Sequence, residues 1–200
     1  MIKYVIFDLD GTLLDTMEDI AGACNHALHA CSCPMHETEK YRTFVGRGIM
    51  NLFRSALPEG QRTEDMVMRM KDNFVPYYDE HKNDLTRPYP GILELLDGLT
   101  AKGIRLAVAS NKYQEATEEL VARYFGDYRF VCVLGQRDGH PIKPDAGIII
   151  EAMDIGFVPL EIQKNVIEYI GAEKLLNIKL GESFIMTPMK SVTAIMGIKK

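Results

Sequence analysis

The sequence lacks the features expected of a membrane, secreted or nucleic-acid-binding protein. No apolar run approaches the roughly 20 residues that span a bilayer, and the N-terminus shows no basic region followed by an apolar stretch. Acidic residues outnumber basic ones, 28 to 23, which gives a formal net charge of −5 and no electrostatic case for binding nucleic acid. We therefore expect a cytoplasmic protein whose partners include neither a membrane nor a nucleic acid.

Cysteine is also scarce, with four in 200 residues. A chain of this length does not need disulfides, and an intracellular setting keeps thiols reduced. One stretch still brings sulfur and nitrogen donors together: His26, His29, Cys31, Cys33 and His36. Their spacing matches no established zinc pattern. We interpret them as ordinary residues of a helix end and the loop that follows it.

Two carboxylates follow the first apolar segment of the chain. Residues 4–7 read as a strand, and Asp8 and Asp10 come directly after it. In extended backbone, side chains two residues apart project to the same side, and open α/β sheets place their ligands at the carboxyl ends of strands. Gly11 then permits a sharp turn. Because like charges this close repel, the pair favours a bound cation or a shared proton, as in a metal-assisted phosphoryl-transfer site.

The pattern of elements changes along the chain and predicts two domains. Residues 15–84 read as helices with no strand candidate, whereas strands at 104–109, 130–134 and 165–170 then alternate with helices. Such alternation predicts a parallel sheet covered on both faces. We predict an α/β core made of residues 1–14 and 85–200, with a helical cap domain inserted at 15–84.

The segment from Asp8 to Asp15, Asp-x-Asp-Gly-Thr-Leu-x-Asp, resembles the signature of the haloacid dehalogenase (HAD) superfamily. Residues 41–48, 56–58, 77–81 and 87–91 resemble its phosphoglycolate phosphatase branch. The resemblance implies a Rossmann-like core with an inserted all-helical cap. It also implies that Asp8 is the nucleophile, which becomes an aspartyl-phosphate, and that Asp10 protonates the leaving oxygen and later activates water.

The resemblance assigns further site residues. Ser110 and Asn111 follow the strand at 104–109 and precede a helix, where a hydroxyl and free N–H groups can bind phosphate. Together with Thr12 and Lys143 they form the implied phosphate-binding set, and the Lys143 ammonium would offset negative charge on the nucleophile and phosphoryl group. In the cap, Arg47 lies between two glycines and could clamp an anionic substrate, which makes it a candidate for substrate specificity.

The chain departs from the family at its fourth motif. Where the family has Gly-Asp-x-x-x-Asp, this chain has Ala172 and Leu176 in the two acidic positions. Three explanations stay open: Glu173 reaches the metal instead, the protein is a weakened or inactive phosphatase kept for binding, or the gene shifted frame or diverged near its end. Asp8, the Asp10 backbone carbonyl and Glu173 are therefore the expected ligands of Mg²⁺, held with reduced affinity.

These residues favour Mg²⁺-dependent hydrolysis of a small phosphorylated metabolite, with phosphoglycolate as the first candidate, by a monomer or homodimer. A haloacid dehalogenase lacks the second aspartate, so Asp10 argues against that activity. A sugar-phosphate mutase shares the cap and both aspartates. A catalytically inactive binding protein of the same fold is the third alternative, because the acids of the fourth motif are missing.

Overall fold

The computed structural model of the protein describes residues 4–156 of the 200. By its internal contacts the chain divides into two compact units: residues 14–87, here called the helical unit, and residues 4–13 with 88–156, here called the core unit. The strand expected at 165–170 lies outside the described residues. In chain order the elements are β1 (Tyr4–Phe7), β2 (Leu14–Asp15), α1 (Met17–Ala30), α2 (Thr38–Tyr41), α3 (Ile49–Ala56), η1 (Glu59–Gln61), α4 (Glu64–His81), β3 (Arg87–Pro88), α5 (Ile92–Ala101), β4 (Arg105–Tyr113), α6 (Gln114–Phe125), β5 (Phe130–Gln136) and α7 (Gly147–Ile155).

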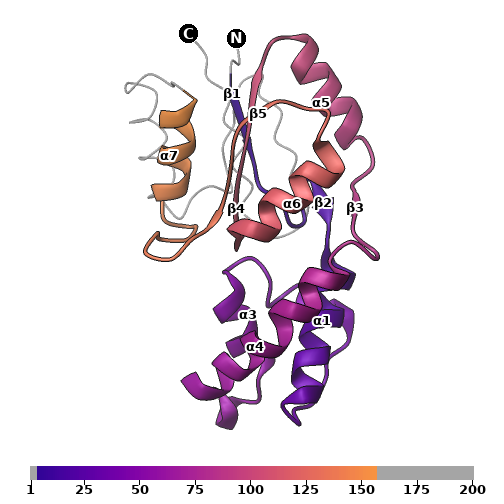
Figure 1. Ribbon diagram of the computed structural model, residues 1–200, viewed down its shortest axis with the longest axis vertical. Coiled ribbons are helices and arrows are strands. Elements are labelled where there is room, and N and C mark those ends of the chain that lie inside the picture. The colour runs from indigo at the N-terminus through magenta and orange to yellow at the C-terminus, as the bar shows by residue number, and fades with distance from the viewer. Residues whose placement is uncertain (1–3, 157–200) are drawn as a thin grey trace. The chain divides into compact units, whose positions relative to one another are not determined.

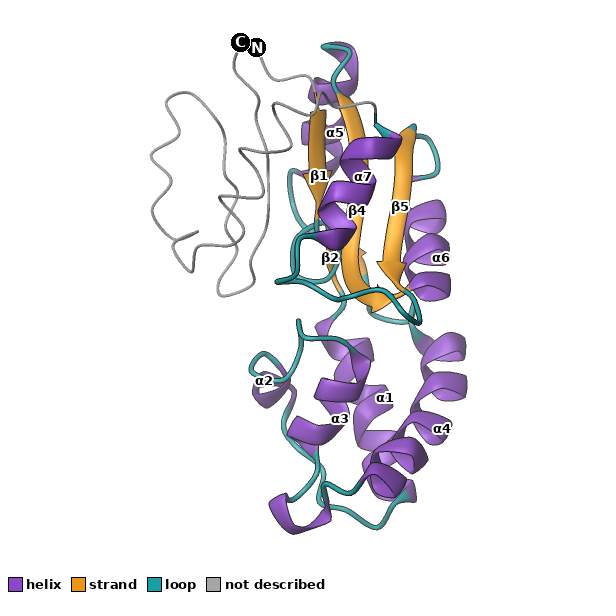
Figure 2. Ribbon diagram, turned by 90° about the vertical axis from the view of Figure 1, so that its left-hand side faces the viewer, coloured by secondary structure: helices purple, strands orange, loops and turns teal. Residues whose placement is uncertain are grey.

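The core unit is built on a parallel sheet, as the sequence predicted. Its three described strands lie in the order β1-β4-β5, with Phe7 opposite Val108 and Ala109 opposite Leu134. Parallel neighbours cannot be joined by a tight hairpin, so each connection must cross over the sheet. α6 supplies the crossover between β4 and β5 (Figure 2). All three strands therefore end at the same edge of the sheet.

Helices cover both faces of this sheet. α7 lies on one face, and α5 and α6 lie on the other, in both views (Figures 1 and 2). The buried cluster under α7 takes alternate residues from neighbouring strands, including Tyr4 and Ile6 from β1 and Ala107 and Ala109 from β4. This period of two is what a pleated strand imposes. The same alternation decides which side chains in the later part of β4 project to the face that α7 covers.

β4 is longer than the sequence predicted. We expected a strand over 104–109 followed at once by a helix, but the strand continues to Tyr113 and α6 begins only at Gln114. Pairing with β5 shifts register between Ala109 and Tyr113 and then resumes, with Tyr113 opposite Gln136. This resumed pairing keeps the intervening backbone extended. Ser110 and Asn111, which we expected to lie between the strand and the start of a helix, therefore belong to the strand itself.

The helical unit has an aromatic core between α1, α3 and α4. Phe53 of α3 meets Phe74 of α4 edge-on at 5.2 Å, and Phe74 stacks on Tyr78 at 5.1 Å. In α4 the buried side chains are those of Val67, Met70, Phe74 and Tyr78. This apolar stripe therefore forms part of the core of the helical unit.

The chain enters and leaves the helical unit beside a short strand pair, β2 with β3. Asp15, which we expected to be helical, belongs to β2. Just inside this point, the buried carboxylate of Asp19 in α1 accepts hydrogen bonds from the backbone N–H groups of Leu85 (3.0 Å) and Thr86 (2.8 Å). One side chain thereby ties the first helix to the last residues of the unit.

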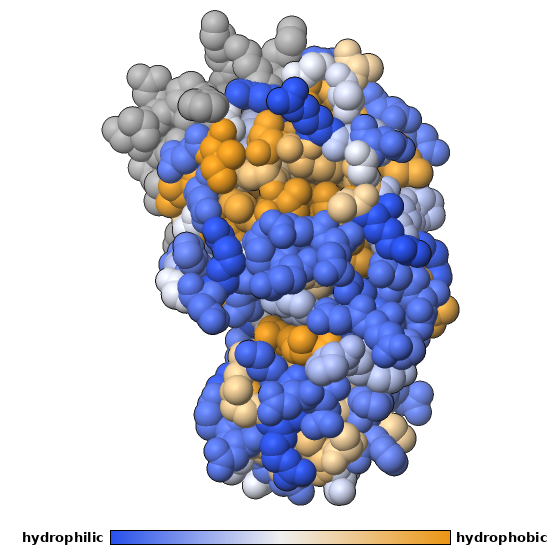
Figure 3. Space-filling model, in the orientation of Figure 1, coloured by the Kyte–Doolittle hydropathy of each residue, from blue (hydrophilic) through white to orange (hydrophobic). Residues whose placement is uncertain are grey.

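Among the described residues, no helix is both long and apolar enough to cross a membrane. The face drawn in Figure 3 is mostly hydrophilic, and the largest apolar patch in that view lies on the core unit.

Candidate active site

Asp8 and Asp10 lie at the carboxyl end of β1, and both carboxylates are largely shielded, with side chains 13% and 14% exposed. Leu9 between them is fully buried, and its N–H donates to Asp8 Oδ1 at 2.8 Å. Gly11 follows with φ of +77°, a conformation that glycine adopts without strain. The turn closes through hydrogen bonds from the N–H groups of Thr12 and Leu13 to Leu9 O.

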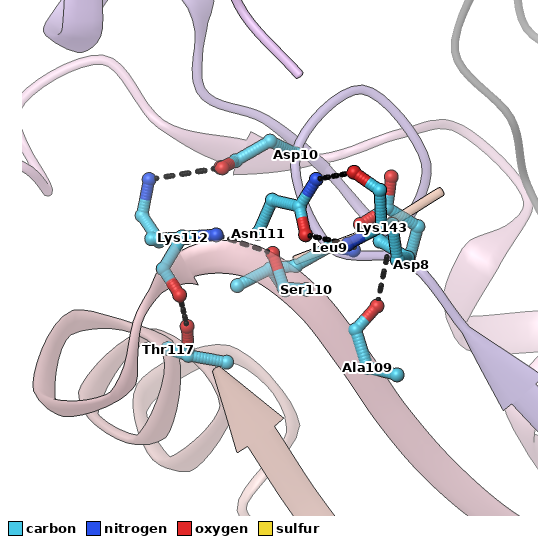
Figure 4. Close-up of polar contacts among 9 residues, drawn as sticks. All are labelled: Asp8, Leu9, Asp10, Ala109, Ser110, Asn111, Lys112, Thr117 and Lys143. Atoms are coloured by element: carbon cyan, nitrogen blue, oxygen red, sulfur yellow. Dashed lines mark hydrogen bonds and ion pairs between the residues drawn. The ribbon is translucent and has the colours of Figure 1, made fainter. Parts of the chain in front are cut away.

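Lys143 lies against the first carboxylate. Its Nζ is 2.8 Å from Asp8 Oδ1 and donates to the carbonyl of Ala109 at 2.8 Å (Figure 4). The two partners come from segments far apart in the chain, so the contact is a product of the fold. It places an ammonium beside the carboxylate that the family resemblance makes the nucleophile.

Lys112 lies against the second carboxylate and was not predicted as a site residue. Its Nζ is 3.0 Å from Asp10 Oδ1 and 3.1 Å from Oδ2, and its side chain is only 5% exposed (Figure 4). The available signal was its position two residues after Ser110. That spacing places two side chains on one side only in a strand, and we expected a helix there.

Ser110 is 1% exposed, and its Oγ accepts a hydrogen bond from Lys112 N at 3.1 Å. It therefore lies inside the extended end of β4, and a helix N-terminus does not supply the N–H groups around it. Thr12 is also buried, at 5% exposed. Both belong to the core unit, as do the aspartates and lysines.

Asn111 holds the segment that carries Lys143. Its Nδ2 donates to Lys143 O at 2.9 Å, and its Oδ1 accepts from Lys143 N at 2.8 Å (Figure 4). The Lys143–Pro144 peptide bond is cis. The structure thus brings Asp8, Asp10, Ser110, Asn111 and Lys143 together.

Charge is balanced within this group, because two carboxylates face two ammonium groups. The repulsion expected between Asp8 and Asp10 is therefore met by two lysines in the described structure. A dianionic phosphoryl group entering here would meet both ammonium groups. Stabilisation of developing negative charge by such fixed positive groups is a major source of catalysis in phosphoryl transfer.

The metal donors that the sequence predicts are oxygen atoms, from the Asp8 carboxylate and the Asp10 backbone carbonyl. Hard oxygen donors suit Mg²⁺, which keeps several waters and takes one or two carboxylates. Across residues 4–156, no three His, Cys, Asp or Glu side chains gather as a metal-binding group. Glu173, the further ligand expected from the sequence, lies outside the described residues.

Arg47 belongs to the helical unit, in the loop between α2 and α3, and its side chain is exposed. Gly46 and Gly48 on either side have φ of +110° and +79°. The backbone carbonyl of Arg47 accepts a hydrogen bond from Asn51 Nδ2 at 2.6 Å. Its role in specificity stays a prediction.

The histidines and cysteines near the end of α1 make separate contacts. Cys33 Sγ donates to Gln61 Oε1 at 3.0 Å, His36 Nε2 lies 2.7 Å from Ala56 O, and His26 stacks on Tyr77 at 4.0 Å. Cys24 is fully buried, and burial raises the pKa of its thiol to about 12. All four cysteines of the chain are free thiols.

A small pocket of about 100 Å³ adjoins Ser110 and Asn111 within the core unit. Arg137, directly after β5, and Glu151 of α7 also line it and form a two-pronged ion pair, at 2.9 and 2.5 Å. The hydrogen bond to Arg137 lowers the pKa of Glu151 below its usual value.

The chain belongs to the haloacid dehalogenase-like hydrolases, because the model of that family matches residues 5–180. The match includes the fourth-motif segment, which lies outside the described residues.

Within the family the chain is phosphoglycolate phosphatase-like. It is 32% identical to the phosphoglycolate phosphatase of Haemophilus influenzae (strain 86-028NP), over 80% of this chain and 75% of that protein. It is 30% identical to the phosphoglycolate phosphatase of Mesorhizobium japonicum, over 74% of this chain and 66% of that one. The chain thus spans 66% to 75% of the length of these two relatives.

Solved structures support the fold. A Haemophilus somnus protein described as a predicted phosphoglycolate phosphatase matches with a TM-score of 0.69 and 29% identity, over 76% of this chain and 70% of its own. CbbY from Rhodobacter sphaeroides, solved in complex with phosphate, matches with a TM-score of 0.62 and 26% identity, over 80% and 75%. The predicted family and α/β fold are confirmed.

Proposed function

We propose that the protein is a Mg²⁺-dependent phosphomonoester hydrolase that works through an aspartyl-phosphate, with phosphoglycolate as the first substrate to test. The observation that supports this most is the Asp8 carboxylate, held at a strand end with the Lys143 ammonium 2.8 Å away. Curated relatives that share about a third of its residues are phosphoglycolate phosphatases.

The reaction uses Asp8 and Asp10 in turn. An Asp8 carboxylate oxygen bonds to phosphorus while the bond from phosphorus to the ester oxygen breaks, and Asp10, in its protonated form, gives its proton to that oxygen. Asp10 then takes a proton from water, whose oxygen attacks phosphorus and releases inorganic phosphate and free Asp8. Lys143, Ser110 and Thr12 form the proposed phosphate-binding set, to which the sequence analysis also assigned Asn111.

Bound Mg²⁺ would supply positive charge that neutralises the transferring phosphoryl group. Asp8, the Asp10 backbone carbonyl and Glu173 are its proposed ligands. Because Ala172 and Leu176 replace the acids of the fourth motif, we predict Mg²⁺ binding at least about tenfold weaker than in the Haemophilus influenzae relative. Calorimetry on both proteins in one buffer measures this, and equal affinities would contradict it. Glu173→Gln weakens binding further if Glu173 is a ligand.

Phosphate release from a panel of phosphomonoesters tests the activity. Asp8→Asn should abolish release, since the amide is a poor nucleophile, whereas Asp72→Asn, an exposed acid of α4, should leave the rate unchanged. Beryllofluoride with excess Mg²⁺ should form an adduct on Asp8 of the wild-type protein. An absence of both phosphate release and this adduct would sink the proposal.

A non-catalytic binding protein is the second candidate, favoured by the missing acids at 172 and 176. It predicts that phosphomonoesters bind but release no phosphate at saturating Mg²⁺. A mutase would instead convert one sugar phosphate into its isomer without net phosphate release, so measuring isomer formation on the same panel separates it from both the phosphatase and the binding protein.

The proposed setting is cytoplasmic, with a small phosphorylated metabolite as partner and a monomer or homodimer as the working form. Four free cysteines fit a reducing compartment. Arg47, exposed in the helical unit, is the proposed specificity residue, and Arg47→Ala should lower kcat/KM on the best substrate.

A further inference from the structure

The side chain of Asn111 bonds to the backbone of Lys143 through both of its polar atoms. Its amide donates to Lys143 O and accepts from Lys143 N, at 2.9 and 2.8 Å, and Asn111 is 6% exposed. In a β-sheet, a neighbouring strand would bond to the N–H and C=O groups of a residue in the same way. Here the side chain of Asn111 makes both bonds. The two residues are 32 positions apart in the sequence.

The alternation of β4 explains which side Asn111 takes. Ala107 and Ala109 belong to the cluster under α7, and Asn111 continues the same parity. Ser110 and Lys112 have the opposite parity, and the Lys112 ammonium reaches Asp10. Figure 4 shows Asn111 directed to the Lys143 segment, while Lys112 is directed to Asp10.

The position of the Lys143 backbone decides where its ammonium can lie. Lys143 belongs to the irregular segment between β5 and α7, which has no sheet ladder of its own. A lysine side chain is flexible and carries about 2 kcal/mol of rotamer entropy. Fixing its backbone restricts the ammonium to the region between Asp8 and the Ala109 carbonyl, where both contacts are 2.8 Å.

We propose that Asn111 is a positioning residue, which acts on the reaction by fixing the backbone of Lys143 rather than by binding substrate phosphate. The inference rests on the proposed function of the Asp8–Lys143 pair. It gives Asn111 a different role from the phosphate ligand that the sequence predicted.

A double-mutant cycle between Asn111 and Lys143 tests this role. In the otherwise wild-type protein, Asn111→Ala should lower kcat by about 10- to 100-fold and change KM by less than about threefold, because misplacement of a catalytic group acts mainly on the chemical step. In the Lys143→Ala background the same change should alter kcat by less than about threefold. Equal losses in both backgrounds, or a KM effect that dominates, would overturn the proposal in favour of a phosphate ligand.

Gln114 offers a matched control. Its side chain also bridges two segments through paired bonds, from Gly135 N and to Val133 O, but it does not touch the Lys143 segment. Gln114→Ala should cost comparable stability yet keep kcat within about threefold. If Asn111→Ala folds poorly, Asn111→Asp replaces it, because its oxygen can still accept from Lys143 N while the donor to Lys143 O is lost.

Lysine labelling tests the proposal without any catalytic activity. Trace acetylation followed by mass spectrometry should show the Lys143 labelling rate rising at least about threefold in Asn111→Ala, because the segment opens more often. The rate at exposed Lys102 should stay constant. Unchanged labelling of Lys143 would overturn the proposal even if the protein releases phosphate. If labelling of Lys143 increases but the protein releases no phosphate, Asn111 still fixes the Lys143 segment and the proposed function is rejected.

Discussion

Lys112 shows, at the scale of single residues, that a side chain's role depends on the conformation of its backbone. It follows Ser110 by two positions, and only an extended backbone directs both side chains to one side. Its ammonium is almost fully shielded and contacts both oxygens of Asp10. Each carboxylate of the Asp-x-Asp pair therefore has its own lysine.

We predict that Lys112→Met lowers kcat about tenfold or more, because the Asp10 carboxylate loses the cation that orients it. Lys112→Arg should recover part of the rate, since it restores the charge with a different shape. The measurement is steady-state phosphate release. Lys71→Met, at an exposed position of α4, serves as the control. A wild-type kcat in Lys112→Met would contradict a role for this ion pair.

At the scale of elements, the end of β5 packs closely against the start of α6. A Cβ on Gly135 would lie 2.7 Å from Gln114 Cα, Lys112 O and Thr117 Oγ1. Two of these atoms belong to the backbone and cannot move aside easily. The glycine at this position is therefore required by close approach between two elements rather than by a turn.

Gly135→Ala should destabilise the protein by about 1–3 kcal/mol, because overpacking displaces the backbone. Gly98→Ala is the matched comparison: it lies inside α5 with no heavy atom within 4 Å of the added Cβ. That change should stabilise the protein by about 0.5–1 kcal/mol, through helix propensity. Urea denaturation of both variants gives the two free energies of unfolding. Effects of the same sign and size would contradict the packing explanation.

The ion pair of Arg137 with Glu151 links the first residue after β5 to α7 and makes stability depend on pH. The hydrogen bond to Arg137 lowers the pKa of Glu151 in the folded state. The ion pair therefore stabilises the fold fully at pH values above the pKa of a glutamate in the unfolded chain, near 4.3. This stabilisation is lost as the pH falls through the lower pKa of Glu151 in the folded protein. We predict that Glu151→Gln costs about 0.5–1 kcal/mol at pH 7, allowing for solvent screening.

The cost of Glu151→Gln should shrink as pH falls below about 4, where the wild-type carboxylate becomes protonated. Denaturant unfolding of both proteins at pH 7 and pH 3 measures the difference. The control Glu80→Gln, on an exposed face of α4, should show little change at either pH. A cost for Glu151→Gln that stayed constant with pH would contradict the assignment.

At the scale of the whole molecule, one compact unit is inserted into the chain of another. The helical unit occupies residues 14–87, and its two ends must come together for the core unit to form a continuous sheet. Asp19 makes this closure within the helical unit, by binding the N–H groups of Leu85 and Thr86 from 66 and 67 positions away.

Asp19→Ala should destabilise the protein by about 2–3 kcal/mol, because the backbone N–H groups of Leu85 and Thr86 lose a charged acceptor. Asp19→Asn should cost less, since its amide oxygen can still accept one of these bonds. Thermal unfolding, with Asp72→Asn as the control, reports the effect. Equal melting temperatures for wild type and Asp19→Ala would show that other contacts fix the backbone at Leu85 and Thr86.

The sequence by itself determined the features that depend on neighbouring residues. The Asp-x-Asp-Gly turn after an apolar strand, the alternation of strands with helices and the change to helices after residue 15 all follow from local patterns. The family and the parallel sheet were predictable for the same reason. Tertiary structure decided the pairing partners: Lys112 with Asp10 across 102 positions, and Asn111 with Lys143 across 32. Strand β4 runs past Ala109 because β5 resumes pairing with it at Tyr113. The residues around Tyr113 do not show which other strand they will pair with, so the length of β4 could not be predicted from its own sequence.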